Sequence, residues 1–389
     1  MKTSAFVYPW DVVGDPDAAR RIADLGVRQV TLAAAYHSTR ALTPRHPRHR
    51  VVTADHASVL YPPDEQHWAA HELRPYPAGD WAPGDAWGEA AAALTDAGLD
   101  VHTWVVLAHN SRMGDEHPDT SVVNAYGDRY PWAPCIAQPA TRAHLVALAA
   151  EAATRPGARG TELESLGWYG LAHLHAHDKT GGVGLGEAAQ YLMALCFCPD
   201  CRDGYARHGL EPDELRRSVR AALEPVWRGE AADDGWGSVE KLLGAETAAA
   251  TRAHRDATAR GLQEAAVAAV REAAPAGFQV LLHADPVSYH CGANAGVDPA
   301  HILSVADGVV VPCTGGAGPL TPFAEQDKGG GKVLAANLTV VRGMGGSPHT
   351  LAADARAARE LGANELRLYH AGLASDADLG LVAEALAEL

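Results

Sequence analysis

Apolar, strand-like segments alternate with helical patterns rich in alanine and leucine along the whole of this 389-residue chain. Repeated strand–helix units over such a length favour a (β/α)8 barrel, or TIM barrel, in one domain over residues 1–389. The predicted strands cover residues 5–10, 29–36, 100–108, 160–166, 278–284, 308–312, 332–338 and 365–369. The predicted helices include residues 15–25, 87–97, 141–153, 247–274, 351–361 and 376–389.

Single glycines join several of these helices to the next strand. Gly26, Gly98 and Gly362 each stand between a helical pattern and an apolar residue, as expected of glycines that end a helix before a parallel strand. The main alternative is a doubly wound open sheet. It would need a glycine-rich phosphate motif after the first strand, where Tyr8-Pro9-Trp10-Asp11 stands instead.

Long segments follow the second and third predicted strands, over residues 37–84 and 109–140, whereas the segments before the strands are short. This asymmetry is typical of a barrel that carries its site at the C-terminal ends of its strands. Residues 202–245 form a polar helical insertion, which we expect to act as a lid or interface within the same domain.

The charge balance limits the partners of the protein. The formal net charge is −16, which disfavours nucleic acid and acidic membrane surfaces. No apolar run reaches the ~20 residues of a membrane span, and no signal-peptide pattern follows Met1. We therefore expect a cytoplasmic protein that binds a small molecule and has neither a nucleic acid nor a membrane as partner; homo-oligomerisation is left open.

Three cysteines form a tight motif, Cys196-Phe-Cys198-Pro-Asp-Cys201. Thiolates at such spacings can converge on one tetrahedral Zn²⁺, and Cys135 is the best fourth ligand. The other two cysteines, Cys291 and Cys313, follow later strand-like segments. A site with four cysteine ligands leaves no open coordination position, so this zinc is predicted to be structural.

The fourth predicted strand carries two glutamates, Glu162 and Glu164, on one face, because side chains alternate along a strand. A carboxylate inside a barrel is costly unless it is paired or functional. Glu164 is nearer the C-terminal end and is our predicted catalytic acid/base. Glu162 is better explained as an ion-paired residue of a barrel layer.

A histidine-rich segment follows that strand. If it is extended, His173, His175 and His177 share a face, next to Asp178, where they could contact substrate hydroxyls, transfer protons or hold a second metal. Ordinary loop structure is the alternative. We predict substrate binding for these four residues.

The fifth predicted strand places His283 and Asp285 on one face, and Asp285 at its end. Asp285 is a predicted catalytic partner of Glu164 in two-carboxylate chemistry. The alternative is that Asp285 caps the turn before Pro286. His283 is predicted to bind substrate.

Other side chains lie at the ends of predicted strands and could bind substrate. Tyr8, Trp10, Trp104 and Trp168 could stack on sugar rings, although each alone is more often a packing residue. The remaining predicted substrate-binding residues are His37, Arg40, Asn337 and Tyr369, together with Trp104 from the aromatic set.

These motifs resemble a known group. A cysteine after the third strand, the C-x-C-x-x-C motif and a glutamate ending the fourth resemble the structural zinc cluster of the family 42 β-galactosidases. A closer resemblance is to glycosyl-hydrolase-like barrel proteins that share the segments Tyr36-His37, Cys135 to Arg142 and Leu163-Glu164-Ser165. This resemblance covers most of residues 1–205 and implies a glycoside-hydrolase-like enzyme with Glu164 as acid/base.

The sequence departs from this group in two places. Retaining enzymes related to this group carry a second glutamate at the end of strand 7, where Asn337 lies in this chain. They also carry an asparagine at the position of Leu163. The second carboxylate would then come from Asp285 or Asp178, or water would attack directly as in inverting enzymes, whose carboxyl groups are ~6.5–9.5 Å apart. The alternatives are a sugar isomerase, epimerase or lyase, and a non-catalytic sugar-binding barrel.

Overall fold

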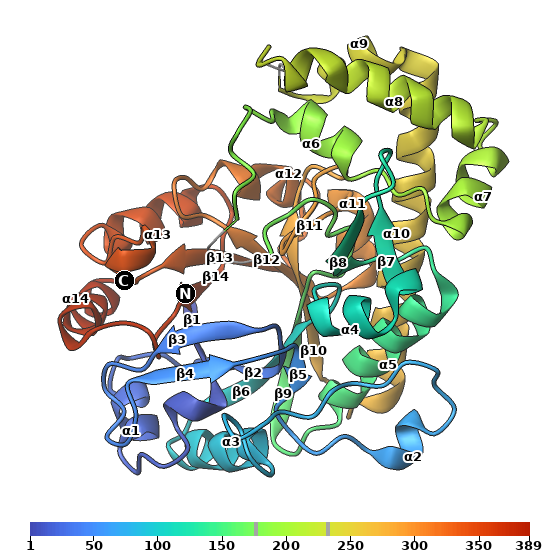
Figure 1. Ribbon diagram of the computed structural model, residues 1–389. Coiled ribbons are helices and arrows are strands. Elements are labelled where there is room, and N and C mark those ends of the chain that lie inside the picture. The colour runs from blue at the N-terminus through green and yellow to red at the C-terminus, as the bar shows by residue number, and fades with distance from the viewer. Residues whose placement is uncertain (175–177, 231–233) are drawn as a thin grey trace.

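The computed structural model describes residues 1–174, 178–230 and 234–389. Eight parallel strands close into a barrel, because the first strand pairs with both the second and the last (Figure 1). The fold is therefore the predicted (β/α)8 barrel. The barrel strands, in spatial order, are β1 (Lys2–Val7), β2 (Gln29–Tyr36), β6 (Asp100–Val106), β9 (Ala158–Glu164), β10 (Gln279–Asp285), β12 (Gly308–Pro312), β13 (Val333–Thr339) and β14 (Glu365–Tyr369).

Helices surround this barrel, and each predicted helix is present with its ends moved by a few residues. Gly26, Gly98 and Gly362 have positive φ angles of 88°, 84° and 103°. Each thus occupies a left-handed position after a helix, where glycine has no Cβ to strain the backbone. The barrel helices are α1 (Ala18–Ala23), α3 (Ala86–Asp96), α5 (Pro139–Ala153), α10 (Ala245–Ala273), α11 (Pro299–Val305), α12 (Thr321–Ala324), α13 (Leu351–Glu360) and α14 (Asp376–Ala387).

The first strand ends earlier than predicted. Strand β1 stops at Val7, and a 3-10 helix, η1 (Pro9–Asp11), replaces the predicted continuation to Trp10. Proline lacks the N–H that a strand ladder needs, and the Asp11 carboxylate accepts a hydrogen bond of 2.8 Å from the Tyr8 N–H. Tyr8 and Trp10 therefore stack on each other, with ring centroids 4.5 Å apart, at the end of the strand.

Two β-hairpins lie in segments that were predicted as loops. Strand β3 (Thr39–Leu42) pairs with β4 (Val51–Ala54), and β7 (Ser121–Val123) pairs with β8 (Arg129–Pro134). Both hairpins follow barrel strands and lie beside the C-terminal end of the barrel. Shorter elements of these segments are β5 (Ser58–Val59), α2 (Glu65–Trp68), α4 (Ser111–Glu116), η2 (Pro118–Thr120), β11 (Ala295–Gly296), η3 (Gly318–Leu320) and η4 (Arg342–Met344).

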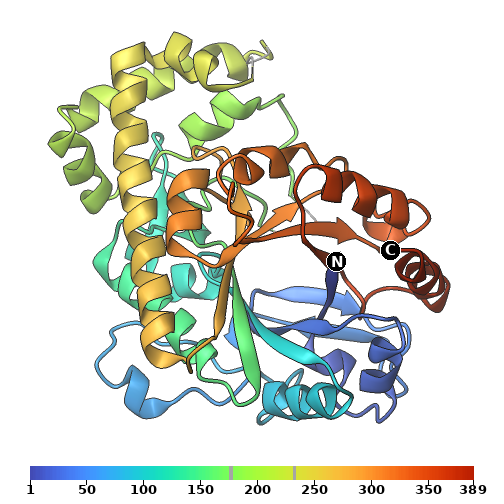
Figure 2. The same ribbon diagram turned by 180° about the vertical axis from the view of Figure 1, so that it is seen from behind.

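A group of helices covers the part of α10 that extends beyond the barrel. Helix α10 runs along the barrel and extends beyond it to contact α9, as the reverse view in Figure 2 shows. Among the described residues, no helix is both long and apolar enough to cross a membrane. The covering helices are α6 (Glu187–Met193), α7 (Pro199–Arg207), α8 (Pro212–Trp227) and α9 (Trp236–Leu243).

Candidate active site and cysteine cluster

A cavity of about 1040 Å³ opens at the C-terminal ends of the barrel strands. A volume at the upper end of the range for small-molecule sites, ~300–1,000 Å³, is large enough for a sugar with a substituent. The structure brings most of the predicted substrate-binding residues into its wall, together with Glu164. Those residues are His37, Arg40, Trp104, His173, His283, Asn337 and Tyr369.

The remaining predicted residues lie elsewhere. Asp178 is absent from the described lining and accepts a hydrogen bond of 2.8 Å from the Leu174 N–H. His175 and His177 lie outside the described residues. Trp168 points away from the cavity, since its Nε1–H donates to the Arg255 carbonyl at 3.0 Å.

Glu164 ends strand β9 and lines the cavity. Its Oε2 accepts a hydrogen bond of 2.6 Å from Trp104 Nε1 and lies 3.9 Å from His283 Nδ1. Its side chain is 12% exposed. Burial raises the pKa of this carboxyl, and the effect exceeds the opposing contributions of His283 and Trp104. Glu164 can therefore hold a proton at higher pH than an ordinary glutamate, as a general acid must.

The backbone turns sharply just after Glu164. Ser165 has a φ of 57°, a left-handed conformation that is uncommon for residues other than glycine. Two backbone hydrogen bonds hold it there, from the Ser165 N–H to Ala293 and from the Ala108 N–H to the Ser165 carbonyl. Such conformations cluster at functional sites, and here the two hydrogen bonds fix the end of β9.

Glu162 lies one layer deeper in the barrel and is fully buried. Its Oε1 accepts hydrogen bonds from Arg367 Nε at 2.6 Å and from Thr31 Oγ1 at 3.1 Å. Burial would raise the pKa of this carboxyl, but the Arg367 charge and contacts with His283 lower it to about 2. Glu162 is therefore an ionised, ion-paired residue of a barrel layer, as we expected from the sequence.

Imidazole rings line one wall of the cavity. The rings of His37 and His109 lie 4.6 Å apart, and those of His109 and His173 5.7 Å apart. Tyr169 stacks on His109 at 4.3 Å. Burial lowers the pKa of His37 to about 4 and that of His109 to about 2, so both rings are neutral at pH 7. His37 and His109 therefore offer uncharged hydrogen-bonding groups and flat faces to a ligand.

Three tyrosines form a second wall. The Tyr8 hydroxyl donates to the Tyr36 hydroxyl at 3.1 Å, and Tyr369 belongs to the same group. Burial raises the pKa of each of these phenols above its ordinary value of 10. They therefore remain protonated at neutral pH and can donate hydrogen bonds.

The structure does not bring Asp285 to Glu164. The Asp285 carboxylate accepts hydrogen bonds from the Val287 N–H at 2.8 Å and from His290 Nδ1 at 3.0 Å. It lines a separate, smaller cavity together with Glu187 and Cys291. The predicted catalytic pair is therefore corrected: Asp285 holds the turn that follows β10, as the alternative interpretation had it.

We expect Asp285→Asn to leave the rate of glycosidic cleavage almost unchanged. The substitution keeps an acceptor for the Val287 N–H and changes no group that lines the main cavity. Steady-state kinetics on any substrate that wild-type protein cleaves would check this. A fall in kcat as deep as that of a Glu164 variant would restore Asp285 as a catalytic partner.

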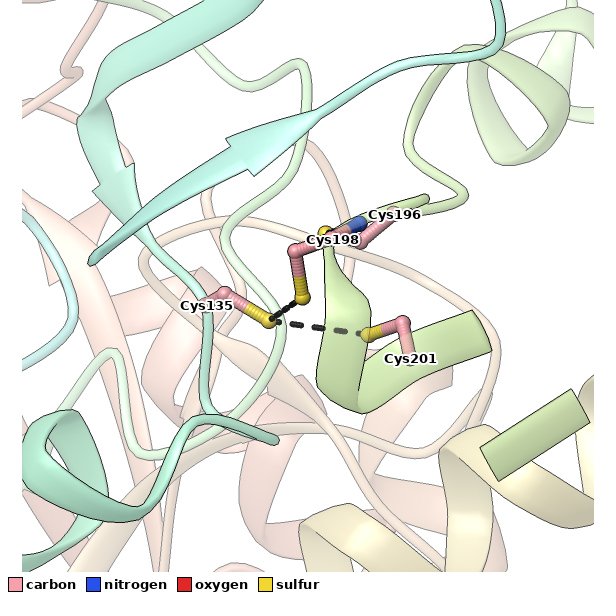
Figure 3. Close-up of side chains that lie close together, drawn as sticks. All are labelled: Cys135, Cys196, Cys198 and Cys201. Carbon is pink, nitrogen blue, oxygen red and sulfur yellow. Dashed lines mark hydrogen bonds between the residues drawn. The ribbon is translucent and has the colours of Figure 1, made fainter. Parts of the chain in front are cut away.

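Four buried cysteines form a compact group away from the cavity (Figure 3). Their sulfur atoms all lie within 4.8 Å of one another, and Cys135 Sγ is 3.6 Å from both Cys198 Sγ and Cys201 Sγ. Four sulfurs at ~2.3 Å from a tetrahedral metal ion would be about 3.8 Å apart. The group has the composition and spacing to hold a metal ion.

The surroundings of this group favour negatively charged sulfur. The Val123 and Cys198 N–H groups both donate to Cys196 Sγ at 3.4 Å, and such hydrogen bonds stabilise metal-bound thiolates. Cys135 follows strand β8, while Cys198 and Cys201 begin helix α7. The group thus joins the hairpin after β6 to the segment after β9, the strand that carries Glu164.

The cavity also contains residues that our sequence prediction missed. His109, Tyr169, Asn294, Thr314 and Thr339 all contribute to its wall. His109 stands directly after the third predicted strand, so its position was a usable signal. Asn294 lies in an irregular segment, and nothing in the local sequence pattern distinguishes it from other loop residues.

The fold is shared with solved glycoside hydrolases. The chain aligns over 100% of its length with α-L-fucosidase isoenzyme 2 from Paenibacillus thiaminolyticus, at a TM-score of 0.60 and 12% identity, and spans 49% of that chain. It matches the PgaB (BpsB) glycoside hydrolase domain from Bordetella bronchiseptica at a TM-score of 0.57 and 16% identity, over 99% of both chains. The catalytic domain of β-amylase from Paenibacillus polymyxa gives 0.58 and 12%, over 100% of this chain and 98% of that domain.

These similarities show that the chain shares its TIM-barrel fold with solved glycoside hydrolases. At such identities they show the fold alone. The sequence matches no protein-family model and no curated protein sequence.

Proposed function

We propose that this barrel hydrolyses the glycosidic bond of a small glycoside or a sugar-like metabolite, with Glu164 as general acid. The observation that carries the proposal is Glu164 itself, a carboxyl with a raised pKa at the C-terminal mouth of the barrel, in the wall of a large cavity. Neutral imidazoles and phenols around it suit the hydroxyl groups of a sugar.

In the proposed reaction, the protonated Glu164 carboxyl gives its proton to the leaving glycosidic oxygen as the bond to the anomeric carbon breaks. The resulting carboxylate then takes a proton from the water molecule that completes hydrolysis. Trp104 Nε1 donates to this carboxyl, and His283 Nδ1 lies 3.9 Å from the same oxygen. Arg40, at the rim, adds a positively charged side chain to the described lining of the cavity.

We further propose that the ion held by Cys135, Cys196, Cys198 and Cys201 is Zn²⁺, in a structural role. A soft thiolate set with tetrahedral spacing favours zinc, and four protein ligands leave it no position for a substrate. We also propose that the protein is cytoplasmic, because these thiols would stay reduced there.

The test is a panel of nitrophenyl glycosides that differ in sugar and anomer, assayed with and without a chelator. We expect nitrophenol release from at least one member and no loss of activity after brief chelator treatment, because the ion takes no part in the reaction. A sugar isomerase, epimerase or lyase with a catalytic metal would instead lose activity. Its products, seen by NMR, would be rearranged or unsaturated sugars.

Trp104→Phe is expected to move the alkaline limb of the pH–rate profile to higher pH by about one unit. The Trp104 N–H stabilises the ionised form of Glu164 and so lowers its pKa; removing a hydrogen bond to a charged group, ~1.5–3 kcal/mol, raises the pKa. Because the acid must be protonated, activity then persists to higher pH. Trp10→Phe, outside the cavity, is the control. A limb that stayed fixed or moved to lower pH would contradict this role.

A further inference from the structure

The cavity of the proposed hydrolase has a single carboxylate in its described lining. Glu162 is fully buried below the cavity and forms an ion pair with Arg367. Asp285 lines another cavity. Glu365 is also paired with Arg367, at 2.8 Å. The described lining therefore does not supply the second carboxylate of a two-carboxylate mechanism, and Asp178, the other predicted source, is absent from that lining.

Asn337 lies on the seventh barrel strand, at the position where the retaining enzymes named in the sequence analysis carry their second glutamate. It faces the cavity from the end of β13, the seventh barrel strand, two residues after the buried Ala335 on the same face. Its Oδ1 is buried and has no hydrogen-bond partner among the described residues. A buried acceptor without a donor costs about 1–3 kcal/mol, and a turn of this amide toward the cavity would let an N–H or O–H group of a ligand supply the donor.

A phenol lines the same cavity from the neighbouring strand. Thr339 pairs with Tyr369 in the β13–β14 register, and Tyr369 lines the cavity with its phenol protonated. The charge of Glu164 contributes to the raised pKa of Tyr369, so the two side chains lie in one region of the cavity. An acceptor and a donor are thus available on adjacent strands, which is the pattern that an amide requires.

We propose that the substrate is a 2-acetamido sugar whose own amide takes the place of the second carboxylate. Asn337 Oδ1 accepts the acetamido N–H, and the Tyr369 hydroxyl orients the acetamido carbonyl. This inference rests on the proposed hydrolase function and names its substrate class.

The reaction balances without a further reagent. Glu164 protonates the glycosidic oxygen while the acetamido carbonyl oxygen forms a bond to the anomeric carbon, and the C–O bond to the leaving group breaks. Water then adds to the anomeric carbon, Glu164 takes a proton from it, and the bond to the acyl oxygen breaks. Two displacements at one carbon leave the sugar with its original anomeric configuration.

The test compares nitrophenyl glycosides that carry a 2-acetamido or a 2-hydroxyl group on the same sugar. We expect kcat/KM to be on the order of 100-fold higher for the acetamide, because an attached nucleophile avoids the entropy of bringing two groups together. Replacing the acetyl hydrogens one by one with fluorine should lower the rate stepwise, since fluorine withdraws electrons from the carbonyl oxygen. Product NMR should show retention.

Variants of Asn337 supply the second part of the test. Asn337→Leu should abolish most of the preference for the acetamide, whereas Asn337→Gln, which keeps an amide oxygen as acceptor for the N–H and adds no carboxylate, should preserve part of it. Thermal unfolding of both variants checks that they fold. Inverted product, or equal rates on the two sugar types with no effect of fluorine, would overturn the inference and leave the hydrolase proposal standing. Absence of cleavage of every glycoside would overturn both.

Discussion

Glu164→Gln is expected to lower kcat on a nitrophenyl glycoside by ~10²–10⁴-fold, which is the usual contribution of a positioned general acid. The amide can still accept the hydrogen bond from Trp104 Nε1 but has no proton to give. Substrate affinity, measured by calorimetry with the variant, should remain close to that of wild-type protein. Enzyme kinetics at several pH values should also show that the alkaline limb of the profile has gone.

Two controls make this result specific. A dinitrophenolate leaving group needs little protonation, so Glu164→Gln should lose much less activity on the dinitrophenyl glycoside. Glu187→Gln makes the same chemical change in the smaller cavity beside Asp285 and should leave kcat unchanged. If Glu164→Gln retained full activity on poor leaving groups, Glu164 would not be the acid. Intact binding with no turnover in wild-type protein would indicate a sugar-binding barrel.

Cys198→Ser is expected to remove zinc and to destabilise the protein together. Four ligands hold a structural zinc ion. Loss of one ligand leaves three buried sulfur groups with no metal ion to hold them together. We expect zinc to fall from about one ion per chain to a small fraction, with the melting temperature lower by roughly 5–10 °C. Plasma emission analysis and calorimetry measure the two quantities on one sample.

Cys313→Ser is the matched control for this experiment. Cys313 is buried and outside the cysteine group, and burial raises its pKa to about 12, so it stays a neutral thiol. Its replacement should leave the zinc content intact. Unchanged zinc content and melting temperature in Cys198→Ser would contradict the metal assignment.

The barrel could be predicted from sequence because its signals are local. Strand β2 and strand β14 have the predicted limits, since the strand-forming residues there closely follow the helix-ending glycines Gly26 and Gly362. The hairpin β7–β8 was missed because Pro131 and Pro134 indicate a loop. Prolines are tolerated in this two-stranded hairpin, because its edges need no further partner.

The site was predictable only in part. Strand alternation placed Glu162 and Glu164 on one face, and their order along the strand separated the deep Glu162 from the cavity-lining Glu164. The same argument failed for Asp285, because His290 from the following loop returns to bind its carboxylate. Such a contact depends on how a loop folds back, which side-chain alternation does not encode.

The most direct test of the central claim is a crystal structure of the Glu164→Gln variant with a glycoside that wild-type protein cleaves. We predict that the sugar lies in the main cavity, with the glycosidic oxygen ~2.6–3.2 Å from the side-chain amide at position 164. The unpartnered Oδ1 of Asn337 should receive a hydrogen bond from the sugar. A sugar bound in the cavity beside Asp285, or a glycosidic oxygen beyond reach of position 164, would contradict the account.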